Sequence, residues 1–80
     1  MSLPIQLSAH ALKQMERRGI TRDYLTRLFK IGHESPDPKA PPAERVFHLD
    51  GPVTRLGREV RVVFKKRPKD RFVITAMFLD

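Results

Sequence analysis

Apolar residues in the first part of the chain recur at the spacing of an α-helix, and good capping residues stand beside two such stretches. Ser8 is a typical N-cap, and Gly19 is typical of a helix end. Thr21 can cap a second stretch, which stops at Gly32 and whose apolar positions are Tyr24, Leu25, Leu28, Phe29 and Ile31. The pattern therefore predicts helices over about residues 9–18 and 22–31.

The second part of the chain changes to the alternating pattern of β-strands. Four prolines between residues 33 and 43 predict a loop that carries the chain from the helices to a sheet. Strands are predicted at 45–49, 59–65 and 72–79, with turns at 50–52 and around 67–70, and Val53 and Leu56 can extend or pair with the first of them. The last two strands would form an antiparallel hairpin.

These elements predict one α+β domain spanning residues 1–80, with strands within 44–79. The two N-terminal helices would pack on one face of a small antiparallel sheet of three to four strands. Alternation assigns to the helix-covered face Val60, Val62, Phe64, Phe72, Ile74, Ala76 and Phe78. The same alternation places the remaining strand residues on the opposite face, and these are Glu59, Arg61, Val63, Lys65, Val73, Thr75 and Met77. A bulge of one residue would exchange the two faces.

The net charge of the chain indicates what kind of partner the domain could bind. The formal net charge is +7, and a basic domain of this kind favours encounter with polyanions such as nucleic acid. The alternative is that the excess of lysine and arginine only keeps a small domain soluble. The chain has no cysteine, which suits a reducing cytoplasm, and we expect neither a signal peptide nor a membrane span.

The sequence lacks the short motifs of several enzyme classes. The chain has no GxxxxGK[ST], GxGxxG or GxSxG motif, so nucleotide hydrolysis, dinucleotide binding and serine hydrolase chemistry lack support. The spacing of His10, His33 and His48 matches no metal template, and we expect no metal and no cofactor. His33 would follow a helix end, and His48 is expected to be structural or on the sheet surface.

Several short motifs occur in a characteristic order: Ser8-x-His10-Ala11, Arg17-Arg18-Gly19-Ile20, Arg45-Val46-Phe47, Val60-Arg61-Val62-Val63 and Val73-Ile74-Thr75. In this order the chain resembles the bacterial domain of unknown function 4258. That family looks related to RelE-type toxins and to the barnase, EndoU and colicin type of nuclease fold. The resemblance implies a compact domain that cleaves RNA without metal, with recurrent polar positions at His10, Arg18, Arg45 and Thr75. Gln14 departs from the arginine common in the family.

The chemistry of metal-free RNA cleavage suits these residue types. It needs a base for the 2′-hydroxyl proton and cations for the charge on phosphate. His10 would stand in the first turn of its helix, where the dipole favours the neutral imidazole that a base requires. Arg18 and Arg45 would hold the scissile phosphate, and Thr75 would bond phosphate or position the histidine. Further RNA contacts are expected from Arg17, Arg61, Lys65, Lys66 and Arg67.

Each of these residues has a simpler interpretation. His10 can be a solvated surface residue, and Arg17 and Arg18 can be the cations that favour a helix C-terminus. Arg61 and Lys65 can belong to a solvated sheet face, and the basic run from Lys65 can be an exposed hairpin tip. Thr75 fits a strand by propensity alone.

The leading hypothesis is a small metal-independent ribonuclease toxin, which acts on RNA by 2′-hydroxyl attack on the phosphodiester. Its partners would be RNA and an antitoxin or immunity protein, and it would act in the cytoplasm of its own cell or of a target cell. The alternative is a non-catalytic module of the same fold that binds RNA or protein. The ribonuclease hypothesis requires His10 to approach Arg45, Arg61 and Thr75 across one cleft.

Overall fold

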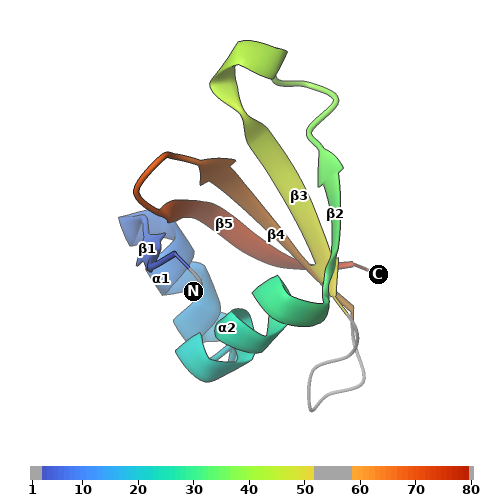
Figure 1. Ribbon diagram of the computed structural model, residues 1–80. Helices are drawn as coiled ribbons and strands as arrows, with labels where there is room; N and C mark the ends of the chain where they lie inside the picture. The colour runs from blue at the N-terminus through green and yellow to red at the C-terminus, as the bar shows by residue number, and fades with distance from the viewer. Residues whose placement is uncertain (1–2, 52–58, 80) are drawn as a thin grey trace.

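The computed structural model describes residues 3–51 and 59–79. The elements follow in the order β1 (Ile5–Leu7), α1 (Ala9–Arg18), α2 (Arg22–Ile31), β2 (His33–Pro36), a 3-10 turn (Pro42–Glu44), β3 (Val46–Gly51), β4 (Glu59–Lys66) and β5 (Arg71–Leu79) (Figure 1). The fold is α+β, as expected. No described helix is long and apolar enough to cross a membrane.

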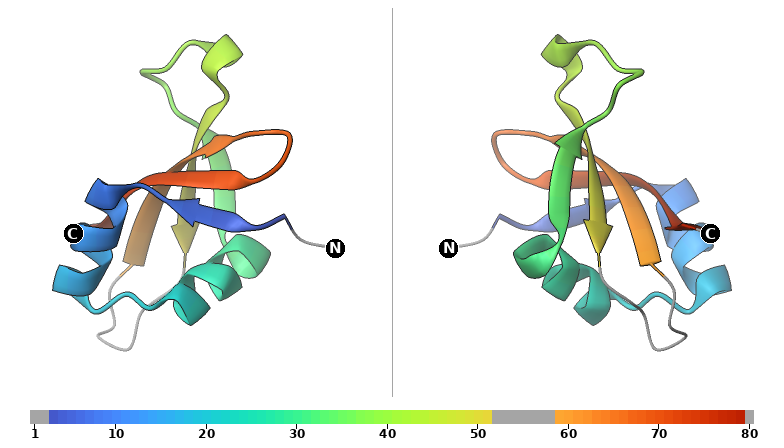
Figure 2. Two further views of the ribbon diagram at one scale, coloured as in Figure 1. Left: turned by 90° about the vertical axis from the view of Figure 1, so that its left-hand side faces the viewer. Right: turned by 90° about the vertical axis from the view of Figure 1, so that its right-hand side faces the viewer.

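The sheet has five strands in the order β1-β5-β4-β3-β2, and both helices lie on one of its faces (Figure 2). The β1 strand runs parallel to β5, and all other neighbours are antiparallel. The expected antiparallel sheet of three to four strands is therefore wrong in number and in one direction. Both unexpected strands are short edges: β1 has three residues, and β2 lies at the start of the segment expected to be a loop.

The capping residues form the helix ends that the sequence indicates. The Ser8 hydroxyl accepts a hydrogen bond of 2.9 Å from the backbone N–H of Ala11, and Thr21 caps α2 through the N–H of Tyr24 at 3.1 Å. Gly19 ends α1 in the left-handed conformation with φ 68°. Ser8 has a second role, because its hydroxyl donates to the carbonyl of Ile74 at 2.8 Å and so ties the start of α1 to β5.

The core lies between the helices and the sheet. Its largest member is Phe64, which is fully buried and meets the ring of Phe29 from α2 edge to face, with 4.9 Å between centroids. The other buried apolar residues are Ala11, Met15, Ile20, Leu25, Leu28, Leu49, Val60, Val62, Val73 and Ala76. Gly51 passes so close to α2 that a Cβ there would stand 1.5 Å from Cδ1 of Leu28.

A bulge in β5 changes which residues face the core. Val63 pairs with Thr75 while the next residue, Phe64, pairs with Val73, so Ile74 is the extra residue. Val73 is consequently fully buried, although strict alternation placed it on the opposite face. Phe72 pairs with Lys65 and therefore leaves the helix-covered face, whereas Ala76 and Phe78 stay on it.

The region between β3 and β4 also differs in part from expectation. Asp50 and Gly51 were expected to begin a turn, but both continue β3 and pair with Arg61 and Val60. The rest of that expected turn, with Val53 and Leu56, lies outside the described residues.

Candidate nucleic-acid interface

The turn from β4 into β5 lies at one end of the sheet (Figure 1), and basic residues are concentrated in and beside this turn. Arg45 joins this group because its carbonyl accepts a 3.0 Å hydrogen bond from the backbone N–H of Lys66. We call the group the basic end; it consists of Arg45, Lys65, Lys66, Arg67, Lys69 and Arg71. Six cations at one end of a small domain form the electrostatic footprint expected of a nucleic-acid contact.

The hairpin that carries the basic end is internally braced. The Arg67 guanidinium donates two hydrogen bonds to the Asp70 carboxylate, at 2.6 and 2.7 Å, and these bonds hold the pKa of Asp70 below its ordinary value. Arg67 also lies over the ring of Phe72, 4.6 Å from its centroid. Arg71 donates to the carbonyls of Arg67 and Asp70, each at 3.1 Å. These contacts therefore hold the turn between β4 and β5 in one conformation.

Acidic partners neutralise only part of this charge. Lys66 forms an ion pair with Glu34 of β2 and lies 4.2 Å from the centroid of the Phe47 ring, and Arg67 is paired with Asp70. No carboxylate among the described residues forms an ion pair with the remaining four cations, which are Arg45, Lys65, Lys69 and Arg71. Three of these four, all except Arg71, are exposed. They are available to phosphate groups.

The open face, which α1 and α2 do not cover, carries a second polar group. Arg61 forms hydrogen bonds of 2.8 and 2.9 Å with the Asp50 carboxylate, which lower the pKa of Asp50 and raise that of Arg61. His48 lies in one row across the sheet with Ser35, Val63 and Thr75, and its Nε2 is 3.5 Å from Oδ2 of Asp37. Arg61 and Thr75 thus share a face, but the charge of Arg61 is already matched by Asp50.

The chain matches one family model, that of the domain of unknown function DUF4258, over residues 7–78. It belongs to this family. The match covers β1 from its last residue, both helices and the other strands up to Phe78, so the DUF4258 domain includes the basic end and the open face. Neither the curated proteins nor the solved structures contain a significant match to the chain.

The polar residues that the family resemblance singles out are distributed over this DUF4258 domain. His10 is exposed in the first turn of α1, and Arg18 lies eight residues further on, about 12 Å along the helix axis. Thr75 projects from the open face, and Arg45 belongs to the basic end. Figure 2 shows α1 and the β4–β5 hairpin toward opposite ends of β5. The four residues therefore come from separate parts of the domain.

One pair among them belongs to neighbouring segments. Ser8 bonds to the carbonyls of Val73 and Ile74, so the start of α1, with His10, adjoins the part of β5 that contains Thr75. The Thr75 side chain itself projects from the open face, on the other side of the sheet from α1, and Arg18 stands at the far end of α1. The other expected RNA contacts are divided likewise: Lys65, Lys66 and Arg67 lie in the basic end, Arg61 on the open face, and Arg17 in the last turn of α1.

Sequence reasoning missed the Asp37–His48 pair, and it placed Lys69 and Arg71 in the hairpin tip without including them among the expected RNA contacts. His48 was considered alone, and the signal that could have drawn attention to it is the carboxylate eleven residues earlier, in a proline-rich segment treated as a plain loop. In the described part of this DUF4258 domain, no three histidine, cysteine or acidic side chains lie close enough together to hold a metal ion.

Proposed function

We propose that this DUF4258 domain binds single-stranded RNA through its basic end. The observation that carries the proposal is a set of four cations around a braced hairpin with which no carboxylate of the described residues forms an ion pair. Phosphate groups are the polyanionic partner that such a set favours, and each contact releases condensed counterions. Phe72 lies beside this set on the open face and offers an aromatic surface on which a base can stack.

The salt dependence of affinity tests this proposal. A fluorescently labelled oligoribonucleotide is titrated with the domain at a series of salt concentrations. We expect log affinity to fall linearly with log salt, with a slope of about −0.7 for each phosphate contacted. A domain that contacts three phosphates would then show a slope of about −2. An affinity that does not change with salt would contradict the proposal.

RNA cleavage by the same domain is a second candidate function. The observation that favours it is the exposed position of His10 in the first turn of α1, beside the part of β5 to which Ser8 is hydrogen-bonded. In this proposal His10 takes the proton of a 2′-hydroxyl, whose oxygen attacks the adjacent phosphorus. The bond to the 5′-oxygen breaks, that oxygen takes a proton from water, and a 2′,3′-cyclic phosphate and a 5′-hydroxyl result. A cleaving toxin would need an antitoxin or immunity protein as partner.

Cleavage is tested by incubating RNA with the domain in the presence of EDTA and analysing the ends of the products. We expect cyclic phosphate ends for the parent and for His33→Ala, which removes another exposed histidine. His10→Ala should reduce the rate at least about 100-fold, the usual contribution of general base catalysis. Intact RNA with the parent, or equal rates for the parent and His10→Ala, would refute this second function and leave the binding proposal unaffected.

A further inference from the structure

A row of polar side chains crosses the open face next to the basic end. It consists of Ser35, His48, Val63 and Thr75, one residue from each of β2, β3, β4 and β5, and we call it the central row. Four neighbouring strands span about 14 Å across a sheet. All four side chains are partly exposed, and all except that of Val63 can form hydrogen bonds. The central row is therefore a hydrogen-bonding strip on a face that neither helix covers (Figure 2).

The hydroxyls of Ser35 and Thr75 are available to a ligand. Among residues 3–51 and 59–79, neither hydroxyl has a hydrogen-bond partner, and no buried side-chain oxygen or nitrogen lacks one, so both hydroxyls reach solvent. Because a hydroxyl both donates and accepts, these two side chains suit a ligand group that is itself a hydroxyl.

His48 lies between these two residues in the central row, and Asp37 orients its ring. Nε2 of His48 is 3.5 Å from Oδ2 of Asp37, and each of the two side chains is 17% exposed. Asp37 is itself fixed, because its Oδ1 accepts a 2.8 Å hydrogen bond from the N–H of Lys39 and its own N–H donates to the carbonyl of Val46 at 3.0 Å. With Nε2 turned to Asp37, Nδ1 is the ring nitrogen left to bond a ligand.

The charge of the open face changes with distance from the basic end. Lys65 lies one row closer to that end, about 7 Å along β4 from Val63, and it is exposed and pairs across the sheet with Phe72. On the other side of the central row, Arg61 is matched by Asp50. A nucleic-acid strand whose phosphate contacts Lys65 would therefore place the adjoining neutral sugar on the central row.

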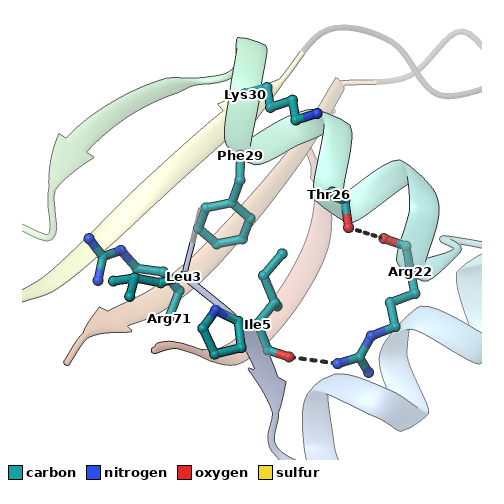
Figure 3. A pocket seen from close by; sticks show the side chains of 8 residues that line it. Leu3, Ile5, Arg22, Thr26, Phe29, Lys30 and Arg71 are labelled. Atoms are coloured by element: carbon teal, nitrogen blue, oxygen red, sulfur yellow. Dashed lines mark hydrogen bonds between the residues drawn. The ribbon is translucent and has the colours of Figure 1, made fainter. Parts of the chain in front are cut away.

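The cations on the helix-covered side of the sheet are arranged differently. A pocket of about 550 Å³ lies between the N-terminal segment and α2, and its lining includes Arg22, Lys30 and Arg71. Arg22 donates a 2.6 Å hydrogen bond to the carbonyl of Ile5, and Arg71 donates to carbonyls of the hairpin. The charged ends of the three side chains point away from one another (Figure 3). These cations do not converge on one ligand, whereas the polar groups of the central row lie on one surface.

We propose that the central row binds ribose 2′-hydroxyl groups and so makes the domain prefer RNA to DNA. The 2′-hydroxyl is both donor and acceptor, and it is the group by which a protein distinguishes the two nucleic acids. The hydroxyls of Ser35 and Thr75 exchange hydrogen bonds with it, and Nδ1 of His48 accepts one. The inference rests on the proposed RNA binding at the basic end, which supplies the phosphate contacts, and the central row adds the choice of sugar.

Binding of three single-stranded oligonucleotides tests the central row. They share one sequence of adenine and cytosine bases and carry ribose, deoxyribose or 2′-O-methylribose. We expect the parent domain to bind the ribose form at least about tenfold more tightly than the deoxyribose form, as expected for two or three neutral hydrogen bonds. The 2′-O-methyl form should also bind more weakly than the ribose form, because a methoxy group cannot donate.

Two variants locate the preference. Ser35→Ala/Thr75→Val removes both hydroxyls, and His48→Phe removes the ring nitrogens. Each should lower the preference for RNA at least about threefold while DNA affinity and the salt slope stay as in the parent, which also shows that the variant is folded. Thr26→Val, at an exposed threonine of α2, is the matched control and should keep the full preference.

Three results would overturn the inference: equal affinity of the parent for RNA and DNA, equal affinity for the ribose and 2′-O-methyl forms, or an unchanged preference in either central-row variant. The first two measurements use the parent alone, so they decide the matter even where a variant does not fold. Failure at the basic end is recognised separately. If RNA and DNA bind equally but affinity still falls with salt, only the central row is refuted; if affinity does not depend on salt, the basic end is refuted.

Discussion

Arg61 and Asp50 stand opposite each other on β4 and β3 and are joined by two hydrogen bonds, of 2.8 and 2.9 Å. The pair removes Arg61 from the proposed RNA-binding set, in which its charge alone would include it. It also determines how the fold responds to acid, because hydrogen bonding to Arg61 lowers the pKa of Asp50.

This pair predicts a pH-dependent contribution to stability. An aspartate in the unfolded chain has a pKa of about 3.9, and the folded value of Asp50 is lower, so its contribution is complete above that unfolded value and is lost as pH falls through the folded one. Asp50→Asn should lower the free energy of unfolding by about 1 kcal/mol at pH 7, and this difference should shrink below about pH 4.

Urea unfolding between pH 3 and pH 7 measures that difference. Glu16→Gln, at an exposed glutamate of α1 outside the first turn, is the control for general charge effects. A cost of Asp50→Asn that stays the same at every pH would show that the ion pair does not contribute as described.

Strict alternation places Val63 and Val73 on the same face of the sheet, but the bulge at Ile74 puts them on opposite faces. The two valines should therefore differ in how much a polar substitution destabilises the fold. Val73→Thr puts a hydroxyl into the core and should cost about 1–3 kcal/mol. Val63→Thr, on the open face, should change stability by less than about 0.5 kcal/mol. Equal losses in urea unfolding would be inconsistent with the bulge.

Ser8 should matter more than an ordinary capping residue. Ser8→Ala removes both the cap on Ala11 and the bond to the Ile74 carbonyl, and should cost about 2 kcal/mol. Thr21→Ala removes only the cap of α2 and should cost about 1 kcal/mol. Chemical denaturation of the two variants compares them, and equal costs would mean that the contact between Ser8 and β5 adds nothing.

The parts of the fold that the sequence predicts correctly are those that depend on neighbouring residues in the chain. Ser8, Gly19 and Thr21 act on their own neighbours in the chain, so the helix ends can be inferred without the fold. The β1 strand is too short to show alternation, and β2 includes Pro36, so neither has a strand signature. The bulge at Ile74 depends on pairing between β4 and β5 and leaves no trace in the alternating pattern.

The candidate site can also be predicted only in part, because some of its features are local in the sequence and others depend on distant residues. The basic run from Lys65 is visible in the sequence, but its effective charge depends on distant partners. Glu34 neutralises Lys66 across 32 residues of chain, and Arg45 reaches the hairpin only through the pairing of β3 with β4.

The central claim is that RNA binds at the basic end, and a pair of charge-matched variants tests it most directly. Lys65→Gln/Lys69→Gln and Lys13→Gln/Arg27→Gln each lower the formal net charge of +7 by two, at exposed positions in the hairpin and on the two helices respectively. RNA affinity is measured for both across a salt series. We expect the first variant to bind more weakly and to lose about 1.4 from the magnitude of the salt slope, with the second close to the parent. Equal loss of affinity and slope in the two variants would show that net charge, and not the basic end, governs binding.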